Sequence, residues 1–118
     1  LTMVNLKRGI VAGFTFLCLT LGAGSVFAED VWAYTYHDGT QAYVDTDSMY
    51  RLIGGKIHVK VKKVKWDRVI SIEEFLFNHD EGSWWYGYRF DNGPYKGGGN
   101  VTNSESVWNI FNVVQQYL

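Results

Sequence analysis

Three histidines, two of them followed directly by acids, are the residues of this 118-residue chain that first suggest chemistry. His37 precedes Asp38, and His79 precedes two acids. A zinc site or a general-base site needs such groups to converge in the fold. The chain contains no H-E-x-x-H or C-x-x-C pattern, and histidines beside acids in turns are usually solvated. We therefore expect no metal and no cofactor, and we expect His58, which lies among lysines, to be exposed.

Nucleophilic and two-carboxylate catalysis also lack a signature. The chain has no G-x-S-x-G pattern, and its one cysteine, Cys18, lies in an apolar N-terminal stretch. The paired acids Asp45 and Asp47, or Glu73 and Glu74, have the residue types of a glycosidase. Such acids in a small β-rich domain usually lie in turns or on the surface. The sequence therefore predicts that the protein is not an enzyme.

Two groups of residues favour binding. Lys56, Lys60 and Lys62 alternate along one predicted strand and concentrate positive charge on one side of it. In the aromatic run that follows, alternation places Trp85 and Arg89 on the face opposite most of the rings. These five residues are the candidate partner-binding site. The alternatives are a solvated strand face for the lysines and core packing for the rings.

The overall composition narrows the class of protein. Its 11 basic and 12 acidic residues give a net charge of −1, and 47% of the residues are hydrophobic. A chain of this charge has no field that would gather nucleic acid, and its apolar content is too high for a disordered chain. The length fits a single domain without a nucleic-acid partner.

Residues 1–28 have the three-part pattern of a secretory signal. A basic start precedes an apolar run, and small residues, Val26 and Ala28, precede the expected cleavage point. The apolar run is too short to span a bilayer. We expect a cleaved segment and a bacterial protein that is periplasmic, extracellular or on the cell surface. The mature chain, about 90 residues without a cysteine or a membrane span, would form one β-rich domain over 29–118.

Period-two alternation predicts most of the secondary structure. Aspartate-glycine and similar turn signals separate the strands, which favours an antiparallel meander over βαβ units. The apolar parity changes near Lys62 and Lys63, which predicts a β-bulge there. The strands are expected at 31–36, 41–44, 56–62, 70–78 and 83–90, with a short strand or helical turn around 48–52.

The apolar period changes to that of a helix at the C-terminus. Thr102, Asn103 or Ser104 can cap a helix over 104–118, and the glycine-rich segment 96–100 before it is expected to be a flexible link. The predicted fold class is α+β, mainly β: an antiparallel meander with one C-terminal amphipathic helix packed on it. The apolar stripe consists of Val107, Ile110, Phe111, Val114 and Leu118.

The order of these features is similar to a known family of exported domains. The similarity is carried by residues 38–45 (DGTQAYVD) followed by Ser48, by 55–62 (GKIHVKVK), by 74–78 (EFLFN) and by 104–107 (SESV). In this order they resemble the bacterial surface-adhesin protein E family. The resemblance implies the same sheet-and-helix architecture and an adhesin-like function. The chain departs from the family in lacking the cysteine pair of many relatives.

Together, these patterns predict an exported, non-catalytic bacterial domain that binds a macromolecular partner at the cell envelope or outside the cell. The expected partner is a host extracellular protein or a glycan. One alternative is a carbohydrate- or peptidoglycan-binding module that uses exposed aromatic residues. A second is a small periplasmic enzyme or inhibitor, which would need a cleft where His37 or His79 meets an acid.

Overall fold

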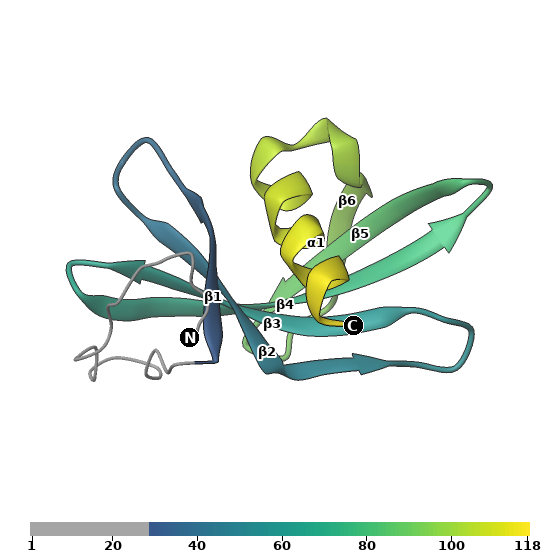
Figure 1. The fold of residues 1–118 in the computed structure, drawn as a ribbon, viewed down its shortest axis with the longest axis horizontal. Coiled ribbons are helices and arrows are strands. Elements are labelled where there is room, and N and C mark those ends of the chain that lie inside the picture. The colour runs from purple at the N-terminus through teal and green to yellow at the C-terminus, as the bar shows by residue number, and fades with distance from the viewer. Residues whose placement is uncertain (1–28) are drawn as a thin grey trace.

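A computed structural model describes residues 29–118; the predicted signal segment, its cleavage point and Cys18 lie outside the described residues. Six antiparallel strands form one sheet in chain order, so each strand pairs with its neighbours in sequence (Figure 1). A 3-10 turn, η2 (Val101–Asn103), leads into the helix α1 (Glu105–Tyr117). This confirms the predicted fold class. The strands are β1 (Asp30–Thr35), β2 (Gln41–Arg51), β3 (Ile57–Lys65), β4 (Arg68–Asp80), β5 (Ser83–Phe90) and β6 (Lys96–Asn100).

The first hairpin forms at the predicted aspartate-glycine turn. Gly39 has a φ of +90°, which favours glycine, and its N–H donates to the carbonyl of Tyr36 at 3.0 Å. The Asp38 carboxylate accepts from the N–H of Thr40 at 2.9 Å. Local turn chemistry therefore fixes the register of β1 against β2 next to the turn, and the register shifts once further on, between Trp32 and Tyr34.

The helix covers one face of the sheet and closes the main core. Phe111 lies in van der Waals range of two sheet residues: its ring centroid is 5.1 Å from those of Phe77 and Trp84. Ser104, one of the three predicted caps, accepts from the N–H of Val107 at 3.3 Å. Four of the five stripe residues are buried as predicted, whereas Leu118 is exposed.

The irregularity predicted near Lys62 and Lys63 is present in the sheet, but it does not cause the change of apolar parity in β3. Pairing with β4 does shift between Lys63 and Val64, but the unpaired extra residue is Ile70 of β4. The apolar side chains in the first half of β3, Ile57, Val59 and Val61, belong to the main core under the helix, whereas Val64 packs with Val69 in a second, small cluster. The apolar positions of β3 therefore change from odd to even because the strand contributes to two separate hydrophobic clusters.

The glycine-rich segment 96–100 is not a flexible link but the edge strand β6. It pairs with β5 through Asn100 opposite Trp85 and Gly99 opposite Tyr86. Gly98 has a φ of +119°, and a Cβ there would overlap the backbone oxygen of Tyr86. Glycine is required by this close approach rather than by mobility.

Residues 29–118 supply all six strands, the helix and both buried clusters, so this segment has a core of its own. No helix in this part of the chain is long and apolar enough to cross a membrane. The helix leaves the opposite side of the sheet, here called the helix-free face, without a second layer of helix or sheet from the described residues (Figure 1).

Candidate functional site

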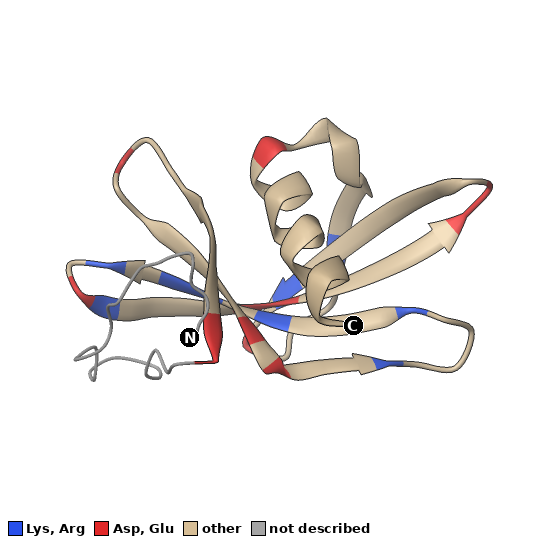
Figure 2. Cartoon of the chain, viewed as in Figure 1, with Lys and Arg blue, Asp and Glu red and all other residues tan. Residues whose placement is uncertain are grey.

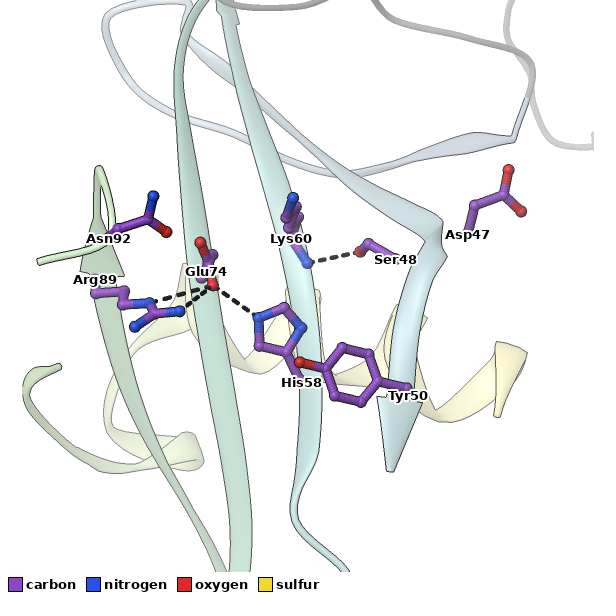
Figure 3. Close-up of a pocket in the computed structure, with 8 residues that line it drawn as sticks. All are labelled: Asp47, Ser48, Tyr50, His58, Lys60, Glu74, Arg89 and Asn92. Atoms are coloured by element: carbon purple, nitrogen blue, oxygen red, sulfur yellow. Dashed lines mark hydrogen bonds and ion pairs between the residues drawn. The ribbon is translucent and has the colours of Figure 1, made fainter. Parts of the chain in front are cut away.

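An open depression of about 490 Å³ lies on the helix-free face, across β2, β3, β4 and the end of β5. Most of its side chains are polar or charged, and we call it the polar depression (Figure 3). It is lined by Asp47, Ser48, Tyr50, His58, Lys60, Glu74, Arg89 and Asn92.

An irregularity in β2 shapes one side of the polar depression. Pairing with β3 shifts between Asp45 and Tyr50. Within it, the Ser48 hydroxyl donates to the Asp45 carbonyl at 2.7 Å and accepts from the backbone N–H of Lys60 at 2.8 Å. Short polar side chains that bond nearby backbone produce such breaks in a ladder. The short strand or helical turn predicted around 48–52 is therefore the second half of one irregular strand, β2.

Glu74 is the centre of the polar depression. Its Oε1 accepts from His58 Nε2 at 2.9 Å, from Arg89 Nη2 at 2.8 Å and from Arg89 Nε at 3.2 Å (Figure 3). Sheet register positions the group, because Arg89 is directly opposite Glu74 and His58 is on the adjacent strand. The hydrogen bond from His58, followed by those from Arg89, lowers the pKa of the Glu74 carboxyl below its usual value.

His58 is buried, so the prediction that it is exposed is wrong. Only 6% of the residue is accessible, because Tyr50 stacks on its ring with centroids 4.6 Å apart and Glu74 binds its Nε2. Because a carboxylate only accepts, Nε2 is the donor, and Nδ1 of a neutral ring is then an acceptor. That Nδ1 is buried with no hydrogen-bond partner.

Arg89 and Asn92 form the other side of the polar depression, and aromatic residues lie near Arg89. The Arg89 guanidinium lies 4.7 Å from the ring centroid of Tyr95, and its bonds to Glu74 raise its pKa. Trp85 is on the same face of β5, as alternation predicted, and it is 42% exposed. Trp66 lies in the β3–β4 turn, about 20 Å along β4 from Glu74 by strand rise, so it does not join this group.

Of the three lysines in the predicted binding site, two are exposed and one is buried. Lys60 is exposed at the polar depression, and Lys56 is exposed in the β2–β3 turn. Lys62, in contrast, is 6% accessible and its Nζ lies 3.0 Å from Oδ2 of the fully buried Asp30 side chain. The edge strand β1 brings that acid onto the helix-free face. The alternative interpretation, in which the lysines lie on a solvated strand face, is therefore wrong for Lys62.

The histidines singled out for catalysis do not meet an acid. His37 is exposed in the β1–β2 turn, and the ring of His79 packs 5.1 Å from that of Trp84. Within residues 29–118, no group of three or more His, Cys, Asp or Glu side chains could hold a metal ion. The His58–Glu74 pair was missed because an alternating strand gives no sign of the register that brings Glu74, which is opposite Lys60, diagonally next to His58.

Comparisons with models of protein families, with curated proteins and with solved structures found no match. The similarity to the surface-adhesin protein E family therefore stays a prediction from the sequence, and the functional argument rests on the residues of this chain.

Proposed function

We propose that this protein is a non-catalytic, exported domain that binds a macromolecular partner at the cell envelope or outside the cell, and that the helix-free face is its binding surface. The observation that supports this most is the polar depression. Three of its charged side chains, His58, Glu74 and Arg89, hold one another in place. Three exposed aromatic residues accompany them: Tyr50 lines the depression, Tyr95 packs against Arg89, and Trp85 lies further along the same face of β5.

The hydrogen bonds of the polar depression favour binding over catalysis. Three N–H groups on one oxygen of Glu74 reduce its strength as a general base. The hydroxyl proton of Ser48 is engaged by a backbone carbonyl rather than by His58. The depression is also open to water, whereas catalytic sites commonly exclude it.

Preorganisation is what such an arrangement offers to a partner. Arg89 is fixed between Glu74 and the Tyr95 ring, so its remaining N–H donors need little further ordering on binding. Lys60 adds a second exposed cation at the same place. An extended protein segment or a glycan chain fits an open surface of this kind better than a small molecule does.

Carbohydrate recognition is a second candidate, and the Tyr50 ring favours it. Its stacking on His58 holds the ring in one orientation, yet Tyr50 remains 51% exposed. Sugar rings pack on such fixed aromatic surfaces, while nearby amide and charged groups hydrogen-bond the hydroxyls. Asn92 and Arg89 line the same depression and could supply those bonds.

The test is binding of purified residues 29–118 to a combined array of extracellular proteins and glycans at low and high salt. We expect Lys60→Glu and Tyr50→Ala to reduce binding at least about tenfold. The control is Trp108→Ala, which removes from α1 an aromatic residue that is 41% exposed, close to the 42% of Trp85. Each variant is first checked for unchanged cooperative unfolding.

The pattern of loss separates the candidates. Salt-sensitive binding to a protein that is lost in Lys60→Glu supports charged recognition. Salt-insensitive sugar binding that is lost in Tyr50→Ala or Trp85→Ala supports the carbohydrate module. Absence of any binding, or equal loss in Trp108→Ala, would overturn the assignment of function to the helix-free face.

A further inference from the structure

The β2–β3 turn presents aliphatic side chains to solvent at its apex. Ile53 is fully exposed and Leu52 is partly exposed. The turn is nevertheless tight: the N–H of Leu52 donates to the carbonyl of Lys56 at 2.7 Å, and the N–H of Gly55 donates to the carbonyl of Leu52 at 3.0 Å. Gly54 and Gly55 both have positive φ, which the turn requires. Hydrogen-bonded geometry therefore holds the aliphatic residues outward.

The arm that carries this turn is anchored in the core. Arg51 pairs with Ile57, which is buried against the helix side of the sheet, and Tyr50 pairs with the buried His58. In the view of Figure 1 the arm extends past the C-terminal end of α1. Residues 51–56, here called the hairpin tip, thus form a short projection whose supporting strands are packed into the core.

Charge around the hairpin tip is of one sign. Arg51 and Lys56 flank the aliphatic apex, and residues 48–59 contain no acid. Figure 2 shows basic positions on both sides of this turn, while acidic positions mark the β4–β5 turn on a separate arm. In the described part of the chain, neither Arg51 nor Lys56 has an ion pair, so both charges face solvent.

We propose that the hairpin tip inserts shallowly into an anionic lipid surface. Leu52 and Ile53 enter the boundary between headgroups and acyl chains, while Arg51 and Lys56 contact lipid phosphates. The half-exposed ring of Tyr50 follows at the headgroup level, where aromatic residues with a polar end are favoured. This proposal goes beyond the binding function of the helix-free face.

The shape of the hairpin tip favours lipid over a protein partner. Stable protein interfaces bury about 800 Å² on each side, far more than two aliphatic side chains at an apex can supply. A bilayer surface accepts a convex projection without a complementary pocket and provides the negative charge that the flanking cations match. The same contact would hold the polar depression, which begins at Tyr50, close to the membrane surface.

The first test is co-sedimentation of residues 29–118 with vesicles of phosphatidylcholine alone or mixed equally with phosphatidylglycerol. We expect binding to the anionic vesicles only. Leu52→Ser with Ile53→Ser, and separately Arg51→Glu with Lys56→Glu, should each lower the partition coefficient about tenfold or more. The matched control is Ile70→Ser, the same residue type exposed on a strand, which should change it less than twofold.

A second measurement does not depend on loss of binding. Residues 29–118 contain no cysteine, so Ile53→Cys can carry a single environment-sensitive dye, with Ile70→Cys as its control. On anionic vesicles, the dye at position 53 should shift to the blue and be protected from an aqueous quencher, and the dye at position 70 should not. The proposal is overturned by equal binding to both kinds of vesicle, by equal loss in Ile70→Ser, or by an unshifted dye at position 53.

Discussion

The two faces of the sheet both bury side chains, and their most buried residues differ in chemistry, although the helix side also holds one ion pair, Lys63 with Glu73 at 3.2 Å. On the helix side, aliphatic and aromatic residues such as Val59, Phe77 and Ile110 lose nearly all contact with water. On the helix-free face, His58 and Lys62 are almost as buried, and each lies against a carboxylate, Glu74 or Asp30. The alternation of apolar and polar residues therefore identifies which residues share a face of the sheet, but it does not show whether that face is exposed to solvent.

The difference has an energetic meaning. Apolar burial stabilises the fold roughly in proportion to area and tolerates many packings. Buried ionic pairs contribute little net stability, but removing one partner of a pair is costly. We therefore expect the helix side to respond to lost volume and the helix-free face to respond to lost charge complementarity.

The largest expected effect is on the helix side. Phe111→Ala should lower the free energy of unfolding by about 4 kcal/mol, because its ring fills the space between Phe77 and Trp84. Chemical denaturation of residues 29–118 measures it. Trp108→Ala, on the exposed side of the same helix, is the control and should cost far less. A loss below about 1 kcal/mol for Phe111→Ala would contradict the docking of α1.

Charge reversal at Lys62 should have the next largest effect. Lys62→Glu places a second carboxylate against the buried Asp30 side chain, and we expect a loss of about 3 kcal/mol. Thermal and urea unfolding at neutral pH measure it. If stability is unchanged, the pair is not buried and the two faces do not differ as described.

Glu74→Gln should have an intermediate effect that depends on pH. We expect a loss of about 1–2 kcal/mol at pH 7, because the amide cannot match a carboxylate that accepts from both His58 and Arg89. The folded-state pKa of Glu74 lies below its usual value of 4.5. The stabilisation by ionised Glu74 is therefore fully present above its ordinary pKa of 4.5. It is lost as the pH falls through the lower folded-state pKa.

Urea unfolding of Glu74→Gln and the unchanged chain between pH 7 and pH 2 tests this dependence. The two stabilities should converge as the pH falls. Glu81→Gln, in the exposed β4–β5 turn, should show no comparable convergence. A difference that grows toward low pH would contradict the assigned sign.

The smallest expected effect is at Lys60, two residues from Lys62 on the same side of β3. Its side chain is exposed, so Lys60→Glu should change the free energy of unfolding by less than about 1 kcal/mol. The same charge reversal thus separates a solvated from a buried position on one face. A loss equal to that of Lys62→Glu would remove the distinction between them.

Local patterns were sufficient to predict the architecture. Alternation, turn residues and the helical stripe depend on neighbours within a few positions, and they gave the meander, the Gly39 turn and the docked helix. The segment 96–100 was misjudged because glycines that permit a close approach look the same in sequence as glycines in a flexible link. Sequence alone does not distinguish these two uses.

The candidate site was less predictable because long-range register assembles it. Lys60, Trp85 and Arg89 were placed on the helix-free face by alternation. Recognising Glu74 as their centre requires knowing that β4 sets it opposite Arg89 and next to His58, which is 16 positions away in the chain. The Lys62–Asp30 pair spans 32 positions and depends on β1, so no local pattern could reveal it.

The chain-order pairing of the strands also bears on how the molecule folds. Each hairpin forms between neighbouring segments, at a small entropic cost of loop closure, whereas α1 must pack against β1 and β2 from the far end of the sequence. The hydrogen bond from the Tyr34 hydroxyl to Glu105 spans 71 positions. We expect the helix to dock last, so that weakening its contacts speeds unfolding more than it slows folding. Until the last thirteen-residue element of the chain is in place, one whole side of a finished sheet faces water.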